Sequence, residues 1–447
     1  MPVSEVIAAM KQVVPAHKTD LAKNDILILK QLTKELIAAK PEAHKEYERF
    51  LGIQQRGLCM PKARLRSRLG GAVILVTGGT GCIGSTLMSE LVKYHPARLV
   101  SVSRGITANW PAQAIAEYMI GDVRDRDRMN EIIQKVRPDI IFHVVAQRSP
   151  ALAEVEVHRT ITTNVFGTRN ILDAAITNGI PQVVLASTGK ALRPYSPEVY
   201  TASKRVAEWE AENACAEIQV SAARFTHVID NSIFYTKLQQ WVESEDEVIR
   251  IHSSDIVFYV QSAIESAQLL LLACIGARLG EFRVHAITDL GWPISLLDVA
   301  VGTIESRLSC TPIYISGYDP GYEEVSFPGL YDQETAGDVS PLFNAFETAA
   351  MVNSPCPMVN TFDMKMSGHL ECKYLLGALE VACKHTEDPL IIRPGLEAMS
   401  WAVLNDTLAA VPQPVLKRTV DILNRNLFAL NPAHLRITNA IRNYAGE

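Results

Sequence analysis

The sequence has no excess of positive charge and no long hydrophobic run, and both absences exclude classes of protein. Its 43 Lys and Arg residues are outnumbered by 49 Asp and Glu residues, so bulk electrostatics attracts neither nucleic acid nor an anionic membrane. The longest apolar run, around 269–276, is far shorter than the roughly 18 residues of a membrane span, and no basic segment followed by an apolar one opens the chain. We therefore expect a cytoplasmic protein with no nucleic-acid or membrane partner.

Closely spaced cysteines are also absent. The eight cysteines include no C-x-x-C pair, and we interpret them as reduced thiols. Cys372, Cys383 and His385 lie near one another in the sequence without the tight spacing of zinc ligands, so we expect a structural use for them and no metal site. What is present, 447 residues with 48% hydrophobic and 21% charged, is typical of a globular chain large enough for two domains.

The first 70 residues predict a helical N-terminal extension. Apolar residues recur at helical spacing within 23–40, with lysines on the other side. The segment "EAHKEYERFLG" and the basic patch "KARLRSRLGG" follow it. Such charged faces are usually solvated, so we interpret residues 1–70 as a packing or oligomerisation arm, with a specialised recognition role as the alternative.

From Gly71 onward the pattern changes to short β-branched runs separated by helical segments. Continuous apolar stretches such as "AVILVTGG", "PDIIFHVVA" and "QVVLAST" indicate strands of a parallel sheet covered on both faces. We predict an α/β fold with a doubly wound parallel sheet of the Rossmann type over 71–250. A smaller substrate-binding lobe is expected over 251–385, and a helical C-terminal extension over 386–447.

The first strand-to-helix turn, "VTGGTGCIGS", has the pattern of a dinucleotide-binding site. Its glycines are spaced G-x-x-G-x-x-G. Glycine permits a tight turn and a close approach of the backbone to a pyrophosphate, and the helix that follows offers N–H groups to the anion. We therefore predict that the cofactor is bound by Gly78, Gly81, Cys82, Ile83 and Gly84.

The end of the second predicted strand bears on the choice between NAD and NADP. NAD-specific sites place an acidic residue there to bind the ribose hydroxyl, whereas this chain has Ser103 and Arg104. A guanidinium matches the geometry of a 2′-phosphate, so we predict NADP, with NAD and a merely solvated arginine as the alternatives. Asp122 and Val123 follow the third predicted strand, where a carboxylate can accept a hydrogen bond from the adenine amino group.

The ordered motifs "TGGTGCIG", "GDVRD", "FHVVAQ", "TNVFGTRN" and "YTASK" resemble the extended short-chain dehydrogenase/reductases. Within that family, "SVSR", "GDVRD" and "STGKALRP" are similar to the capsular-polysaccharide branch, which includes inverting UDP-N-acetylglucosamine 4,6-dehydratases and nucleotide-sugar epimerases. The resemblance covers roughly residues 71–300. It implies an extended Rossmann fold, a nucleotide-activated sugar as substrate, and transient oxidation to a keto-sugar with NADP.

The resemblance also implies catalytic roles for three residues. Thr188 matches the hydroxyl that holds the reacting sugar oxygen, Tyr200 the proton acceptor, and Lys204 the residue that binds the nicotinamide ribose. Side chains four apart share one face of a helix, and a nearby lysine can lower the pKa of a tyrosine from its usual value of about 10. Ala146 falls in the segment that lines the nicotinamide, whereas His143 is expected to be a core residue.

One catalytic position departs from the family pattern. The branch usually reads S-T-D-K where this chain reads S-T-G-K, with Gly189 in place of the aspartate and Lys190 matching the lysine. In the dehydratases the lysine removes a proton beside the ketone and the aspartate protonates the departing hydroxyl, but glycine donates no proton. We therefore predict epimerisation with Lys190 as the base, and slow or absent loss of water unless Glu154 or Glu198 supplies the acid.

Two basic positions on the substrate side depart as well. The family tends to have arginines where this chain has Val257 and Asp319. Those arginines meet the nucleotide diphosphate in the family. Their absence weakens the case for a UDP-sugar unless Arg148, Arg224 or Lys237 compensates.

Three classes of function remain open. The first is a nucleotide-sugar epimerase or dehydratase that retains its NADP throughout the reaction. The second is a net NADP-dependent oxidoreductase that acts on another polyol or sugar-like substrate. The third is a non-catalytic cofactor sensor, which would not need the set of Thr188, Tyr200 and Lys204.

The resemblance finally implies a homodimer or a higher homo-oligomer. In it the helix after Asn164 and the helix that carries Tyr200 pair with their copies in a four-helix contact. Val165, Ile171 and Ala175 fit a buried stripe for that contact, although they could equally face the sheet.

Overall fold

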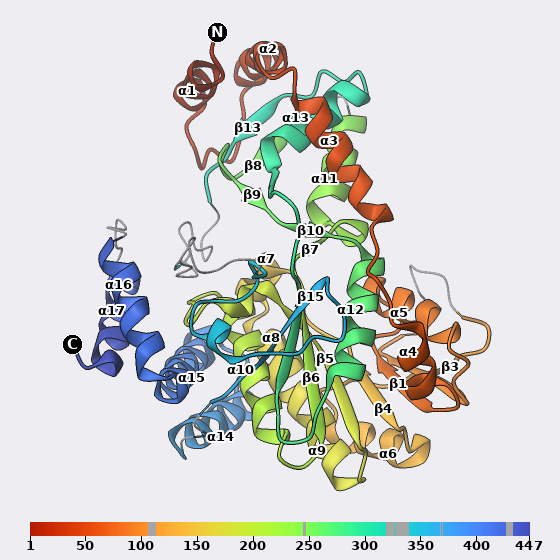
Figure 1. Cartoon of the computed structure of the whole chain (residues 1–447). Coiled ribbons are helices and arrows are strands. Elements are labelled where there is room, and N and C mark those ends of the chain that lie inside the picture. The colour runs from red at the N-terminus through yellow and green to blue at the C-terminus, as the bar shows by residue number, and fades with distance from the viewer. Residues whose placement is uncertain are drawn as a thin grey trace. The chain divides into compact units, whose positions relative to one another are not determined.

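The computed structural model describes residues 1–105, 113–244, 247–318, 327, 339–366, 368, 370–425 and 432–447 (Figure 1). The chain forms two compact units, and each is discontinuous in sequence. The smaller comprises Met1–Arg56, His227–Ala263 and Leu290–Glu324, and the larger comprises Gly57–Thr226, Ile264–Asp289 and Val325–Glu447. Each unit therefore contains residues from more than one of the four consecutive segments that the sequence analysis expected.

A nine-stranded sheet forms the centre of the larger unit, in the order β14-β15-β11-β6-β5-β4-β1-β2-β3. The seven strands from β11 to β3 in that order run parallel, whereas β15 is antiparallel to both of its neighbours, β11 and β14. Chain order reverses between β1 and β4, which is where open α/β sheets bind ligands, at the carboxyl ends of the strands. The strands are β1 (Val73–Thr77), β2 (Arg98–Ser103), β3 (Glu117–Ile120), β4 (Ile140–His143), β5 (Gln182–Thr188), β6 (Gln219–Phe225), β11 (Arg283–Ile287), β14 (Met351–Val352) and β15 (Val359–Asp363).

The central strands are buried on both faces, as their continuous apolar sequences predicted. All four residues of β4 are buried, and so are four of the five in β1, which requires cover on both sides of the sheet. The helical elements that precede or connect these strands are α4 (Lys62–Leu69), α5 (Cys82–Val92), α6 (Arg126–Val136), α7 (Pro150–Val155), α8 (Val157–Ile161), η2 (Thr162–Phe166), α9 (Gly167–Thr177), η3 (Gly189–Leu192), α10 (Val199–Ala214), α12 (Ala263–Gly276) and η5 (Glu347–Ala350). This confirms the doubly wound α/β prediction.

The smaller unit has a core that the N-terminal helices share with the middle of the chain. The hydroxyl of Tyr314, a buried residue, donates to the carbonyl of Pro15 at 2.7 Å, and the N–H of Ile313 donates to Oγ1 of Thr33 at 2.9 Å. The first 56 residues are thus an integral part of this core. Its elements are α1 (Val3–Val13), α2 (Lys23–Ala39), α3 (Ala43–Gly52), η1 (Ile53–Gln55), β7 (His227–Val228), η4 (Ile229–Asn231), α11 (Ile233–Glu243), β8 (Ile249–Ile251), β9 (Val257–Phe258), β10 (Val260–Gln261), β12 (Ile294–Ser295), α13 (Leu296–Ser306) and β13 (Ile313–Ile315).

Four C-terminal helices complete the larger unit: α14 (Leu370–His385), α15 (Pro389–Ala410), α16 (Gln413–Arg425) and α17 (Pro432–Ala445). They are drawn in blue in Figure 1. Side chains of α14 and α15 form one buried cluster with side chains of α7, α8, η2 and α10. Cys372 and Cys383 belong to this cluster, which gives both a packing role. Among the residues that the structure describes, no three His, Cys, Asp or Glu residues form a group that could hold a metal ion.

The same cluster bears on the predicted dimer contact. Val165, expected at that contact, is buried in the cluster with α14 and α15 of its own chain. Ile171 and Ala175 are also fully buried within the chain, which fits the alternative that this stripe packs inside one protomer. A homodimer and its contact stay predictions.

In the described part of the chain, no helix combines the length and the apolar character that crossing a membrane requires.

Candidate active site

The turn between β1 and α5 has the geometry of a phosphate cradle. Gly78 has a φ of 81°, in the left-handed region that side chains disfavour. A Cβ on Gly84 would lie 2.0 Å from the carbonyl oxygen of Gly78, so glycine is required for α5 to begin this close to β1. Gly81 is the N-cap residue of α5, and no side chain at this position caps the N–H groups of the first helical turn. Cys82 and Ile83 form the first helical turn, where the helix dipole favours an anion. This turn fits the pyrophosphate of a dinucleotide.

The predicted adenosine end lies where β2 and β3 finish. The hydroxyl of Ser103 is buried and has no hydrogen-bond partner among the described residues, while Arg104 is exposed. Asp122 accepts a hydrogen bond from Arg124 at 2.6 Å. Burial tends to raise the pKa of Asp122, but the hydrogen bonds from Arg124 and the charges of Arg124 and Arg104 lower it. Arg104 thus has a carboxylate within electrostatic reach, which the sequence had not indicated. Val123, which follows Asp122, is buried.

The loop after β4, which contains Ala146, is fixed by an asparagine. The N–H of Gln147 donates to Oδ1 of Asn164 at 2.8 Å, and Nδ2 of Asn164 donates to Oγ of Ser203 at 3.0 Å. Asn164 lies in the π-helical turn η2, and such turns are frequent at functional sites. These bonds connect the loop beside the predicted nicotinamide position to α10.

His143 is a core residue, as predicted. Its Nδ1 lies 2.8 Å from the hydroxyl of Thr77 and its Nε2 lies 3.1 Å from the hydroxyl of Thr168. Burial lowers its pKa to about 3. The neutral ring therefore bridges two buried hydroxyls and has no proton to offer near neutral pH.

The structure brings the three predicted catalytic residues together at the end of β5 and the start of α10. Burial raises the pKa of the Tyr200 phenol, while a hydrogen bond with Thr188 and the charge of Arg148 act in the opposite direction. Lys204 donates from Nζ to the carbonyl of Ala186 at 2.7 Å, and burial lowers its pKa to about 8. The lowering of the tyrosine pKa by Lys204 stays a prediction, and Thr188 and Arg148 lower this pKa in the structure.

Lys190 is held by a carboxylate. Its Nζ donates to Oε2 of Glu198 at 2.7 Å, and the same oxygen accepts from Oγ1 of Thr201 at 2.8 Å and lies 3.2 Å from a guanidinium nitrogen of Arg193. Burial tends to raise the pKa of Glu198, but the charges of Lys190 and Arg193 keep it below its usual value. The carboxylate is therefore a weak proton donor, and its charge favours the ammonium form of Lys190 over the form that would act as a base.

Glu154 is the other alternative acid. Its Oε1 accepts from the N–H of Val199 at 2.8 Å, and its Oε2 lies 2.5 Å from a guanidinium nitrogen of Arg393. Burial, which outweighs the charge of Arg393, raises its pKa. Of the two carboxylates, Glu154 is thus the better proton donor, although both of its oxygens have partners.

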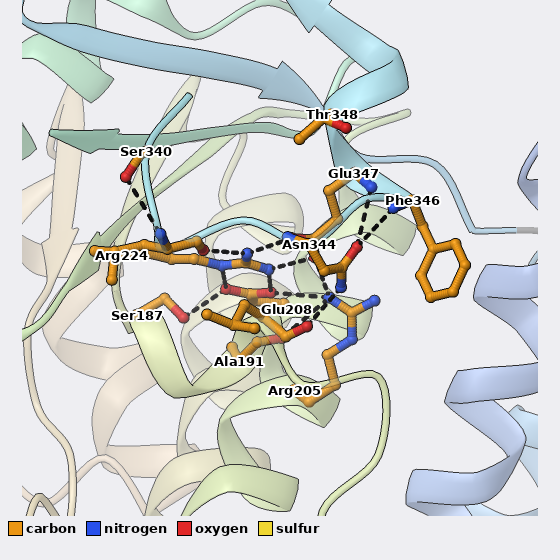
Figure 2. A network of polar contacts seen from close by, with 12 residues as sticks. Ser187, Ala191, Arg205, Glu208, Arg224, Ser340, Asn344, Phe346, Glu347 and Thr348 are labelled. Carbon is orange, nitrogen blue, oxygen red and sulfur yellow. Dashed lines mark hydrogen bonds and ion pairs between the residues drawn. The ribbon is translucent and has the colours of Figure 1, made fainter. Parts of the chain in front are cut away.

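A buried ion network lies beside these residues (Figure 2). Arg224 bonds to Glu208 through Nε at 2.9 Å and through a terminal nitrogen at 2.7 Å, and it bonds to Glu347 at 2.7 and 2.8 Å. Arg205 bonds to Glu347 at 3.0 Å and to Thr407 of α15 at 3.1 Å. Two cations and two anions balance one another, and they join β6, α10, η5 and α15.

The network removes Arg224 from the residues that were expected to compensate on the substrate side. Its side chain is fully buried, and both of its terminal nitrogens bond to Glu347, so it is not available for a diphosphate. Arg148 and Lys237 are exposed. Val257 is 58% exposed on β9, and Asp319 lies outside the described residues.

The loop between Lys190 and Tyr200 packs on the C-terminal helix α15. The ring of Tyr195 stacks on Trp401 with 4.2 Å between the centroids, and its hydroxyl donates to Glu397 at 2.9 Å. No local pattern in the sequence predicts this packing, because the partner residues lie far along the chain.

The chain belongs to a family described as polysaccharide biosynthesis proteins, whose model matches residues 74–325. It is 26% identical over 292 residues to a probable polysaccharide biosynthesis protein EpsC of Bacillus subtilis, covering 61% of this chain and 48% of that protein. It is 31% identical over 170 residues to a UDP-N-acetylglucosamine 4,6-dehydratase (inverting) of Campylobacter jejuni, covering 36% of this chain and 50% of that protein. The chain thus spans about half the length of these curated relatives.

A solved structure shares the architecture. Pen from Bacillus thuringiensis aligns with a TM-score of 0.56 and 22% identity, covering 66% of this chain and 87% of that one. At this identity the likeness shows the fold. Together with the family match and the strand order, it confirms the predicted extended Rossmann fold of the short-chain dehydrogenase/reductase type.

Proposed function

We propose that this chain is an enzyme that modifies a nucleotide-activated sugar through transient oxidation with bound NADP, as an epimerase or a dehydratase. The observation that carries this proposal is the proximity of the Thr188 hydroxyl to the Tyr200 phenol, which lowers the pKa of that tyrosine, beside Lys204 at the carboxyl edge of the parallel sheet. Membership of the polysaccharide biosynthesis family and the similarity to a UDP-N-acetylglucosamine 4,6-dehydratase support it. A cytoplasmic location stays a prediction.

The residues present fit a nicotinamide dinucleotide. The turn from Gly78 to Gly84 would hold its pyrophosphate, Ser103 and Arg104 its 2′-phosphate, and Lys204 its nicotinamide ribose. The buried hydroxyl of Ser103, which has no partner among the described residues, has a hydrogen bond to offer there. When bound, the group supplies an acceptor for hydride.

Two residues of the chain act on the substrate hydroxyl during its oxidation. Tyr200 accepts the hydroxyl proton, and Thr188 holds the oxygen from which it leaves. Burial raises the pKa of Tyr200, and the nearby Thr188 hydroxyl and the charge of Arg148 favour the phenolate. The Lys204 ammonium, with a pKa lowered to about 8, remains mostly charged at neutral pH and can bind a ribose hydroxyl.

The proposal is tested by incubating the enzyme with candidate UDP-hexoses and NADP in deuterated water. We expect isomers of the starting sugar nucleotide, without loss of water, by mass spectrometry and NMR. Deuterium that appears in the product and disappears in Lys190→Ala would assign the base to Lys190, despite its ion pair with Glu198. Isomers without deuterium would place the inversion at the oxidised carbon itself. Failure of every sugar nucleotide to react would contradict the proposal.

Cofactor choice is a separate prediction. Calorimetric titration should show NADPH binding about 10-fold or more tightly than NADH, since a charged hydrogen bond between Arg104 and the 2′-phosphate is worth about 1.5–3 kcal/mol. Arg104→Ala should remove most of this difference. Arg128→Ala is the matched control, because that arginine pairs with Glu131 on α6. Equal affinities of the parent for the two dinucleotides would refute the NADP assignment.

A further inference from the structure

The position at which the family pattern has an acid is filled by a leucine from a distant segment. A Cβ on Gly189 would lie 2.6 Å from Cδ2 of Leu342, 3.3 Å from its Cγ and 3.4 Å from the carbonyl oxygen of Phe225. Real Cβ atoms are essentially never found within 3.0 Å of another atom in this way. Leu342 is 4% exposed, so a side chain at 189 and Leu342 in its present position exclude each other.

The buried ion network fixes this leucine. The carbonyl oxygen of Leu342 accepts from Arg224 at 3.0 Å, and its N–H donates to Oγ of Ser340 at 3.3 Å. Nearby, Nδ2 of Asn344 donates to the carbonyl of Leu192 at 2.5 Å, which ties the same segment to η3. Figure 2 shows Arg224, Ser340 and Asn344 gathered in this network. These bonds fix the backbone of Leu342, so a side chain at 189 requires the Leu342 side chain to change its rotamer within buried surroundings.

Gly189, whose side-chain space Leu342 fills, lies next to the proposed catalytic residues. Gly189 stands between Thr188, which ends β5, and Lys190, whose N–H donates to the Thr188 hydroxyl at 3.3 Å. A proton donor that takes the place of the family's acid would have to lie at position 189, between Thr188 and Lys190. Glu198 is kept ionised by Lys190 and Arg193, so it does not replace the missing acid.

We propose that Leu342 is a specificity-determining residue. By filling the space beside Gly189, it excludes an acidic side chain at position 189, so that water is not eliminated from the keto-sugar. The inference rests on the proposed function. Elimination breaks a C–H bond beside the ketone, whose electron pair forms a C=C bond while a base takes the proton. It also breaks the next C–O bond, whose electron pair leaves with the hydroxyl, and the hydroxyl becomes water only when an acid protonates it. An alkyl side chain at the place of the acid leaves that last step without a proton source at position 189, and the other candidate acid, Glu154, has both oxygens engaged by Val199 and Arg393.

The packing claim is tested on the full chain with Gly189→Asp, Leu342→Ala and the double variant. Gly189→Asp should lower the unfolding midpoint because its side chain meets Leu342, and Leu342→Ala should lower it by leaving a cavity. The double variant should lose less than the sum of the two, because each change relieves the other. Gly377→Asp is the matched control. Nothing lies within 4 Å of a Cβ at Gly377, so its effect should simply add to that of Leu342→Ala.

The reaction claim is tested by mass spectrometry of the products that the same proteins make from the UDP-hexose that the parent converts. The double variant should form the product that has lost water about 10²-fold or more faster than the parent, the usual gain from a positioned acid. A chain with Gly189→Asp,Leu342→Asn, which offers the aspartate a polar neighbour of leucine size, gives a second opportunity for that gain if the alanine variant folds poorly.

Each result decides a different part of the inference. Additive losses of stability for Gly189→Asp and Leu342→Ala would overturn the packing claim, whatever the enzyme does. A parent that already eliminates water, or variants that are coupled in stability but eliminate none, would overturn the role of Leu342 while leaving the proposed function in place. Failure of the parent to convert any sugar nucleotide would overturn the proposed function and, with it, the role of Leu342.

Discussion

Replacing Tyr200 with phenylalanine is expected to lower the turnover number by about 10²–10⁴-fold. The substitution removes the hydroxyl that lies near Thr188 and that would accept the substrate proton, but it keeps the aromatic ring. The affinity for NADP should therefore change little. Product formation from a sugar nucleotide measures the first effect, and calorimetric titration with the dinucleotide measures the second.

Tyr195→Phe is the matched control for this prediction. It removes a tyrosine hydroxyl from the same stretch of chain, but that hydroxyl donates to Glu397 on α15. Turnover by Tyr195→Phe should match that of the parent. If Tyr200→Phe also kept the parent's turnover, Tyr200 would not be the proton acceptor and the geometry at the start of α10 would need another explanation.

Replacing Arg224 with methionine should lower the free energy of unfolding by about 3–5 kcal/mol, the usual cost of removing one partner from a buried ion pair. The change leaves Glu208 and Glu347, both buried, with one guanidinium in place of two. Urea unfolding at neutral pH measures the loss. Glu131→Gln, which breaks the exposed pair between Arg128 and Glu131 on α6, should leave stability unchanged within error. An equally small change for Arg224→Met would show that the network contributes little.

The pH dependence of stability gives this prediction a second readout. Burial tends to raise the pKa of Glu208, but Arg224, Arg205 and the hydroxyl of Ser187 lower it below the usual value of a glutamate. A lowered pKa in the folded state contributes stability above the ordinary pKa, and this stability is lost as the pH falls through the lowered value. Arg224→Met should reduce that acid-side dependence, because it removes the largest favourable charge from Glu208.

The parts of the structure that could be predicted from the sequence are those set by local geometry. The glycine turn was predictable because the contact between a Cβ at 84 and the carbonyl of Gly78 depends on the turn alone. The parallel strands were predictable because a strand buried on both faces must be continuously apolar. Tyr200 and Lys204 were predictable as a pair because one helix carries both.

The remaining features depend on segments that are far apart in the sequence. The burial of Arg205 and Glu208 follows no local pattern, because their partners lie in α15 and η5. Leu342 covers Gly189 without any pattern that links the two. Val165 belongs to a stripe that was expected to be buried, but the sequence does not show that α14 and α15 pack against it.

Transient oxidation of the substrate is tested by counting product molecules against dinucleotide. The parent protein is incubated with an excess of the UDP-hexose that it converts and with much less NADP, while NMR follows the sugar and absorbance follows reduced dinucleotide. We expect many product molecules for each dinucleotide and no accumulation of NADPH. Product limited to one molecule per NADP, with NADPH formed in equal amount, would contradict it and would identify a net oxidoreductase.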